Sequence, residues 1–235
     1  MLLKNPNFGD DGHPSRGEQT MEVSVFLFLI IPSMAFSFFA IREGSMTFRL
    51  VAVSAILRDL SLVALILFFL WRNRESLSLI GLTSGKFWRE AGLGAALFLP
   101  VSILVSLLQM VFRATGLEAP STPLPAFLAA EGIAEFILAT LLVIVVAISE
   151  EIIFRGYLIL RFGSITRDPS LSVVLSAAIF SLGHGYEGSA GVATVGFLGA
   201  ILALIYLWRG SLVAPIVMHF LQNFVGIVIL PLLKG

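Results

Sequence analysis

Seven long apolar stretches dominate the chain, and short polar or Gly/Pro-marked connections separate most of them. A helix needs roughly 20 apolar residues to cross the hydrocarbon core of a bilayer. Most of the stretches approach this length, and the fifth is shorter. An eighth, re-entrant helix would change only the C-terminal side of the pattern. It predicts membrane-spanning helices at residues 21–41, 50–71, 93–112, 133–154, 171–183, 192–208 and 212–233.

The first twenty residues break this pattern. They are rich in Gly, Pro, Asn and Asp and have no apolar period, which predicts a disordered tail at residues 1–20. The single histidine in this tail, His13, is interpreted as a solvated side chain. No long-period repeat and no second core follow, so residues 21–235 are predicted to form one transmembrane domain. The fold class is therefore all-α, a polytopic membrane helix bundle of about seven or eight helices.

Composition supports a membrane protein. Hydrophobic residues make up 57% of the 235 residues and charged residues only 13%, against about 25% in a typical soluble domain. The formal net charge is zero and the basic residues form no tail or stripe, so no nucleic-acid partner is expected. Cysteine is absent, which excludes disulfides, thiolate zinc sites and cysteine nucleophiles.

Ionisable residues inside apolar spans are costly and therefore informative. Arg58 and Asp59 lie in the middle of the second predicted span, where a buried structural pair that reaches other helices is the favoured interpretation. Glu131 and Glu135 begin the fourth span. Acidic residues suit a helix N-terminus, so these two are interpreted as caps.

The fourth predicted span ends in the sequence AISEEIIFRG. Glu151 and Arg155 are four residues apart, so their side chains share one helix face and can form an ion pair. Glu150 points about 100° away from Glu151 and has no basic residue three or four positions later. A carboxylate placed in this way is a candidate general base. The competing interpretation is that both acids simply meet solvent at the helix end.

Two further spans contribute similar groups. His184 ends the fifth span four residues after Phe180, and His219 lies in the seventh span four residues before Asn223. Each histidine taken alone is more often a hydrogen-bonded core residue. Three helices that each carry such a group inside apolar sequence indicate a functional site built from residues 150–223.

Basic residues in the loops predict the orientation, because cytoplasmic loops carry an excess of Lys and Arg. With the N-terminus in the cytoplasm, nine basic residues lie on that side and four on the other. This count predicts an inner or plasma membrane protein whose site lies near the cytoplasmic end of the fourth helix. The nine are Lys4, Arg16, Arg72, Arg74, Lys86, Arg89, Arg161, Arg167 and Arg209. The four are Arg42, Arg49, Arg113 and Lys234.

These residues resemble the CPBP family of intramembrane glutamic endopeptidases, which comprises the type II CAAX prenyl endopeptidases and bacteriocin-processing or self-immunity relatives. The family has three signatures on separate membrane helices, EExxxR, FxxxH and HxxxN. This sequence matches all three in order. The matching residues are Glu150, Glu151 and Arg155, then Phe180 and His184, then His219 and Asn223.

The resemblance implies a peptidase in which Glu150, assisted by His184, activates water for attack on an amide carbonyl. His219 and Asn223 would then donate hydrogen bonds to the developing oxyanion. Glu151, Arg155 and Phe180 would support these groups. No metal and no cofactor is implied. The expected partners are the lipid bilayer and a membrane-associated or lipid-anchored peptide or protein substrate.

Two alternatives remain open at the level of sequence. In the first, Glu150 or Glu151 with His184 and His219 binds zinc and leaves one position for water. In the second, the protein is not a protease and its polar groups serve transport, immunity or a scaffold. The motifs alone do not separate these alternatives from a metal-free protease.

Overall fold

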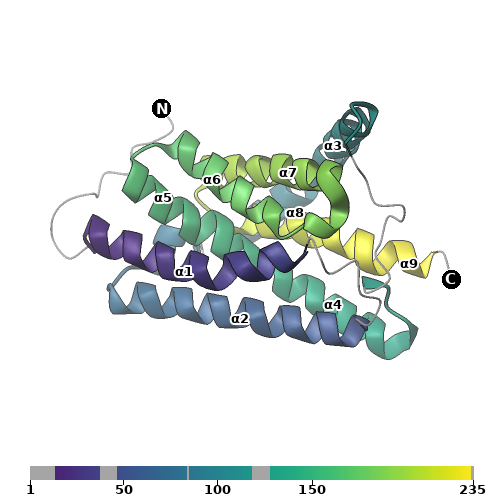
Figure 1. The fold of residues 1–235 in the computed structure, drawn as a ribbon, viewed down its shortest axis with the longest axis horizontal. Coiled ribbons are helices and arrows are strands. Elements are labelled where there is room, and N and C mark those ends of the chain that lie inside the picture. The colour runs from purple at the N-terminus through teal and green to yellow at the C-terminus, as the bar shows by residue number, and fades with distance from the viewer. Residues whose placement is uncertain (1–13, 38–46, 84, 118–127, 234–235) are drawn as a thin grey trace.

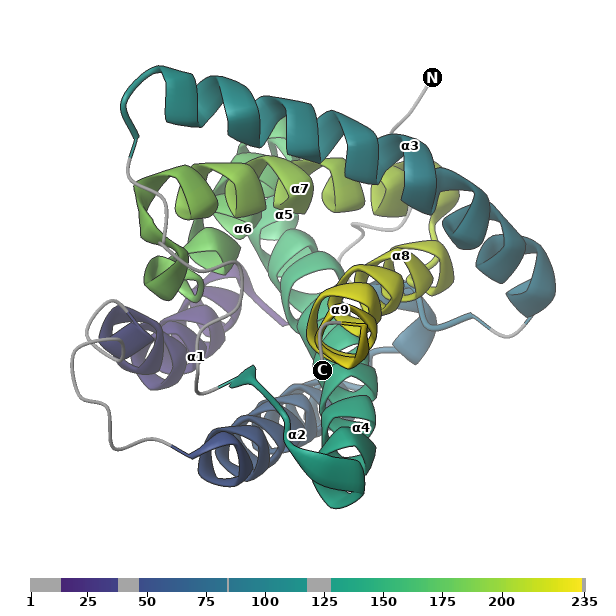
Figure 2. The same cartoon turned by 90° about the vertical axis from the view of Figure 1, so that its right-hand side faces the viewer.

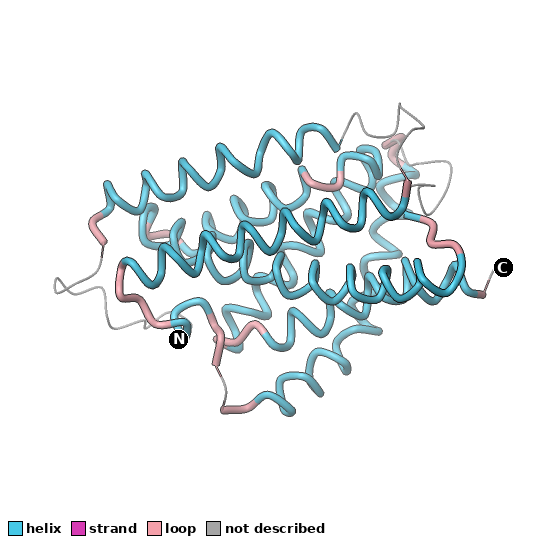
Figure 3. The backbone as a smooth tube through the Cα atoms, turned by 90° about the horizontal axis from the view of Figure 1, so that it is seen from below, coloured by secondary structure: helices cyan, strands magenta, loops and turns pink. Residues whose placement is uncertain are grey.

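The computed structural model describes residues 14–37, 47–83, 85–117 and 128–233. This part of the chain forms helices, turns and loops and contains no strand (Figure 3). The predicted tail at residues 1–13 lies outside the described residues. The all-α fold class predicted from the sequence is confirmed.

The helices follow one another in a simple order. Elements η4 and η6 are π-helical, and η2 and η5 are 3₁₀-helical. Within the described residues, six helical segments are long and apolar enough to cross a membrane, and α6 is a shorter apolar helix. The order is α1 (Arg16–Ser37), α2 (Phe48–Arg72), η2 (Leu77–Ile80), α3 (Phe87–Ala114), α4 (Gly132–Glu150), η4 (Glu151–Leu158), α5 (Ile159–Thr166), α6 (Pro169–Leu182), η5 (Gly185–Glu187), α7 (Gly188–Arg209), α8 (Val213–Asn223), η6 (Phe224–Ile229) and α9 (Leu230–Leu232).

The continuous run α4–η4–α5 passes through the centre of the bundle. It contacts α1, α2, α6 and α8 along its length, while α3 crosses the outside over α7 (Figures 1 and 2). All eight residues of η4 are buried, and its apolar members belong to the largest hydrophobic core. The segment that directly follows the candidate base Glu150 is therefore fully enclosed.

The predicted end of the fourth span is wrong. The helical run does not stop at residue 154 but continues to Thr166. In the sequence, Arg155 and Arg161 suggest the end of a spanning helix because both are charged. In the structure each is only 1% exposed and is paired with a glutamate. Glu150 therefore lies in the middle of the run and not at its end.

Helix α1 begins at Arg16, inside the predicted tail. Ser15 and Glu18 form a reciprocal capping box at this point: the Glu18 amide donates to the Ser15 hydroxyl, and the Ser15 amide donates to the Glu18 carboxylate at 2.7 Å. Such a box satisfies two amide groups that a helix N-terminus otherwise leaves unpaired. The helix therefore starts before its apolar sequence does.

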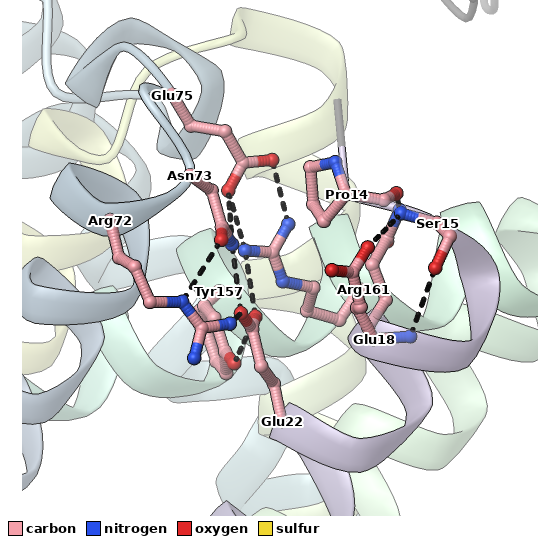
Figure 4. Close-up of polar contacts among 10 residues, drawn as sticks. Pro14, Ser15, Glu18, Glu22, Arg72, Asn73, Glu75, Tyr157 and Arg161 are labelled. Atoms are coloured by element: carbon pink, nitrogen blue, oxygen red, sulfur yellow. Dashed lines mark hydrogen bonds and ion pairs between the residues drawn. The ribbon is translucent and has the colours of Figure 1, made fainter. Parts of the chain in front are cut away.

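A buried ion cluster joins the start of α1, the end of α2 and the run α4–η4–α5 (Figure 4). Arg161 donates to both oxygens of Glu75, at 2.8 and 2.5 Å, and lies 3.1 Å from Glu22. Arg72 donates to the other oxygen of Glu22 at 2.5 Å. Two cations and two anions cancel, which is the condition for burying charges at acceptable cost. The cluster fixes the end of the bundle that lies away from α9.

Close packing of α3 on α8 depends on Gly94, which leads to a stability prediction. A methyl group at this position would lie 2.6 Å from the Ala214 carbonyl oxygen, whereas one at Gly92 on the same helix would meet nothing within 4 Å. We expect Gly94→Ala to lower the free energy of unfolding by about 1–3 kcal/mol through overpacking. Gly92→Ala should leave it unchanged or raise it. Thermal unfolding in detergent compares the two variants, and equal melting temperatures would contradict the prediction.

Candidate active site

The junction of α4 and η4 supplies two acids with different surroundings. Glu151 is fully buried, and Arg155 donates from Nη1 to its Oε1 at 2.9 Å, which is the pair that the four-residue spacing predicts. Arg155 also donates from Nη2 to the Gly199 carbonyl of α7 at 3.2 Å. A side chain at Gly199 would begin 3.3 Å from this guanidinium nitrogen. The absence of a side chain at Gly199 therefore gives Arg155 room to reach the α7 backbone.

His219 of α8 lies between the two acids. Its Nδ1 atom is 2.8 Å from Glu151 Oε1, and its Nε2 atom is 3.7 Å from Glu150 Oε2. A ring whose Nδ1–H donates to Glu151 is fixed in orientation and directs Nε2 toward Glu150. The Oε2 atom of Glu150 has no hydrogen-bond partner among the described residues. His219, which the resemblance assigns to the oxyanion, is thus the imidazole in contact with both acids.

Phe180 of α6 packs against three charged or polar groups. Its ring centroid is 5.1 Å from that of His184 and 5.9 Å from that of His219. The Arg155 guanidinium carbon lies 4.3 Å from the Phe180 centroid, within the range of a cation–π interaction. The ring of Phe180 therefore helps to hold two imidazoles and one guanidinium in place.

His184 follows the last turn of α6. Its Nδ1 atom lies 3.3 Å from the Phe180 carbonyl oxygen. When Nδ1 carries the proton and donates to this carbonyl, Nε2 is left as an acceptor. Among the described residues, the Asn223 carboxamide has no hydrogen-bond partner. Both side chains are thus available to a bound molecule.

One cavity brings the candidate residues together. It has a volume of about 610 Å³ and is lined by Glu150, His184 and Asn223, a size typical of ligand sites. Glu151, Arg155 and His219 are not among its lining residues and lie behind its wall. Apolar residues form most of the remainder. They include Met34, Leu50, Val51, Ala55, Leu128, Leu142, Val143, Val146, Phe180 and Ile227.

The cavity extends along α2 and α4 toward the ends at which these helices begin. On α2 the lining residues recur every three or four positions from Leu50 to Arg58, and on α4 from Leu142 to Glu150. Each set therefore forms one helix face. Figure 2 looks onto this end of the bundle, where α2 and α4 start and α9 finishes. It is opposite to the end that the buried ion cluster fixes.

Sequence reasoning missed two lining residues, Arg58 and Tyr186. Arg58 and Asp59 were interpreted as a buried structural pair whose side chains could reach other helices. They bond each other, from Arg58 Nε to Asp59 Oδ1 at 2.8 Å, and Asp59 is buried, whereas the Arg58 side chain is 43% exposed. Its position on the same helix face as Val51 and Ala55 was the available signal. Tyr186 lies beside His184, with ring centroids 5.9 Å apart.

A metal centre would need several His, Cys, Asp or Glu side chains close together. Within the described residues, no group of three or more His, Cys, Asp or Glu side chains is placed to hold a metal ion. The zinc alternative therefore gains no support from a ligand set in this part of the chain. The arrangement instead offers one carboxylate, one imidazole and one carboxamide around a shared space.

Comparison with known proteins gives one match. Residues 132–225 match a family model described as type II CAAX prenyl endopeptidase Rce1-like. The matched segment begins with α4 and ends within η6, so it includes every motif residue of the candidate site. No curated protein and no solved structure gives a significant match.

Proposed function

Because residues 132–225 match the model of the Rce1-like type II CAAX prenyl endopeptidases, we propose that the protein is an intramembrane glutamic endopeptidase. It is an integral membrane protein of a protease family, and the proposal concerns its mechanism and substrate. The substrate would be a membrane-associated or lipid-anchored polypeptide. The supporting observation is that Glu150, His184 and Asn223 line one cavity while His219 lies between Glu150 and Glu151.

In the proposed mechanism, Glu150 accepts a proton from water as the water oxygen attacks the scissile carbonyl carbon. Its Oε2 atom has no hydrogen-bond partner among the described residues. The proton then passes from Glu150 to the amide nitrogen as the carbon–nitrogen bond breaks. The carboxylate is thereby restored, and one water molecule is consumed for each bond cleaved. General base catalysis of this kind contributes roughly 10²- to 10⁴-fold in rate.

Three other side chains would orient the water, bind the oxyanion and position the base. His184 lines the cavity and is placed to orient the attacking water with its free ring nitrogen. The Asn223 carboxamide donates to the oxyanion, a contribution worth about 3 kcal/mol per donor in other enzymes. His219 is not among the lining residues, so the geometry favours a role through Glu150. With Nδ1 fixed by Glu151, its Nε2 atom positions the base.

The apolar lining strengthens these interactions. Charges and dipoles attract more strongly where water is scarce. Most lining residues of α2 and α4 are aliphatic, which also suits a substrate with a hydrocarbon chain or apolar side chains. A membrane-associated polypeptide combines such a portion with a peptide bond. The proposed substrate class follows from this combination.

The orientation of the chain in the membrane remains a prediction, and the position of the cavity changes what it implies for the site. The expectation of a site toward the cytoplasm relied on Glu150 lying at a helix end, and that premise is wrong. If the N-terminus is inside, the cavity extends toward the opposite side of the membrane. The chain has no cysteine, so single cysteines report the topology directly.

We expect Thr115→Cys, after α3, to react with a membrane-impermeant maleimide on intact cells. Gly85→Cys, before α3, should react only after permeabilisation. Both positions are exposed, and a methyl group at Gly85 would meet nothing within 4 Å. The two sites flank one spanning helix, so each serves as the control for the other. The reverse labelling pattern would overturn the predicted orientation.

The proposed function is tested by comparing peptides released from membranes that contain the wild-type protein or Glu150→Gln. Products that vanish with Glu150→Gln identify both the activity and its substrates. Activity that survives strong chelators separates the metal-free mechanism from the zinc alternative. If no peptide depends on Glu150, the proposal of proteolysis fails. That result would favour a transport, immunity or scaffold role.

A further inference from the structure

Two residues of the candidate site stand at the start of a π-helical segment. Segment η4 begins directly after Glu150, and within the described residues the second such segment, η6, begins directly after Asn223. A π-helix bonds residue i to residue i+5, is rare, and occurs mostly within α-helices, frequently at functional sites. Because an α-helix has 3.6 residues per turn, a wider turn changes the directions in which the side chains point. Contacts that hold η4 in place therefore bear on the acids at its start.

Ser176 of α6 makes such a contact. Its hydroxyl donates to the Phe154 carbonyl of η4 at 2.6 Å, and the residue is 1% exposed. A serine hydroxyl inside a helix commonly bonds a carbonyl four residues earlier on the same chain segment, as Ser172 does with Asp168 at 2.7 Å. Ser176 instead reaches the backbone of another helix. Its hydrogen bond ties the π-helical segment to α6.

The side of α6 that carries Ser176 also meets the site. Ser176, Phe180 and His184 follow one another at four-residue intervals, so they lie along one side of α6 and the turn after it. The Phe180 ring packs against the Phe154 ring, with centroids 5.0 Å apart. His184 lines the cavity together with Glu150. The position of η4 along this side of α6 therefore determines how far the Glu150 carboxylate lies from the His184 imidazole.

We propose that Ser176 is a positioning residue for hydrolysis. Its hydrogen bond to the Phe154 carbonyl sets the register of η4 against α6, and so holds Glu150 and His184 at the separation that the activation of water needs. Ser176 is not among the residues that line the cavity, so it acts through the site and not on the substrate. This inference rests on the proposed function and adds to it a residue outside the three sequence motifs.

The first test is the steady-state hydrolysis of a peptide whose release depends on Glu150. Ser176→Ala removes the hydroxyl and adds no bulk. A misplacement of about 1 Å can lower a rate roughly 10²-fold. We therefore expect kcat to fall roughly 10- to 100-fold, with KM close to the wild-type value because the cavity lining is unchanged. A wild-type kcat would overturn this inference alone, whereas a wild-type protein that hydrolyses no peptide would overturn the proposed function.

Ser172→Ala is the matched control. Ser172 is also fully buried and lies on the same face of α6, but its hydroxyl bonds within its own segment. This variant should lose about as much thermal stability as Ser176→Ala and keep a wild-type kcat. Equal losses of kcat would show a general loosening of α6 and overturn the proposal. If Ser176→Ala does not accumulate, Ser176→Cys keeps the volume with only a weak donor, and the same expectation and refutation apply to it.

The double variant Ser176→Ala, Glu150→Gln separates positioning from a loss of folded protein. If Ser176 acts through Glu150, removal of its hydroxyl should lower kcat little further once the base is absent, because residues that act as a unit are not additive. A merely structural role would lower kcat by the same factor in the presence and absence of Glu150. Losses that multiply in the double variant would therefore overturn the proposal.

Discussion

Replacing Glu150 with glutamine is expected to lower the rate of peptide-bond hydrolysis by roughly 10²- to 10⁴-fold. The amide has nearly the same shape as the carboxylate but cannot accept the proton of the attacking water at neutral pH. Glu150 Oε2 has no hydrogen-bond partner among the described residues and lies 3.7 Å from His219, so the substitution breaks no hydrogen bond of this oxygen. The loss should therefore appear in kcat, with KM and melting temperature close to the wild-type values.

Glu135→Gln provides the matched control, because Glu135 lies on the same helix and pairs with the exposed Arg49. It should retain nearly full activity. The measurement is steady-state hydrolysis of a substrate identified from released peptides, with purified protein in detergent or lipid. Equal losses in the two variants, or a substantial rate with Glu150→Gln, would remove Glu150 from the role of general base.

Contacts within one helix could be predicted from the sequence. Side chains four residues apart lie on the same face of a helix, and Glu151 and Arg155 do form the expected ion pair. The length of the apolar runs likewise predicted the apolar helices. In both cases the information is local, because helix geometry alone fixes where the next side chains point.

Contacts between helices could not be predicted in this way. Sequence spacing fixes the direction of His219 around α8, but it does not fix the rotation of α8 relative to η4. Only the packed bundle shows that His219 reaches Glu151 at 2.8 Å and approaches Glu150 with its other nitrogen. The position of Arg58 in the cavity wall depends on packing in the same manner. The ion pair within one helix was predictable, whereas the contacts between helices were not.

The misplaced end of the fourth span has a related cause. A charged residue in the sequence predicts the end of a membrane helix, because an unpaired charge is costly in hydrocarbon. Arg161 has its partner Glu75 far away in the sequence, in the connection that follows α2. Folding brings the two together and removes the cost, so the helix continues through residues that appear to end it.

Arg155→Met is expected to destabilise the protein by about 3–5 kcal/mol, the usual cost of removing one partner from a buried ion pair. The substitution leaves the fully buried Glu151 carboxylate with His219 as its remaining hydrogen-bond partner. It also removes the hydrogen bond to Gly199 and the contact with the Phe180 ring. Methionine has a similar length and is apolar, so the loss should reflect the stranded charge more than a cavity. Reversible unfolding in mixed detergent measures the difference.

The double variant Glu151→Gln, Arg155→Met decides whether charge is the cause. It removes the unpaired carboxylate, so most of the lost stability should return. The Nδ1–H of His219 then donates to a weaker acceptor, so activity should stay low. Arg209→Met, which breaks the less buried pair with Glu90, should cause a clearly smaller loss than Arg155→Met. If the double variant is as unstable as Arg155→Met alone, the destabilisation comes from lost packing around Phe180 and Gly199. The ion pair would then contribute little to holding the acids of the site in place.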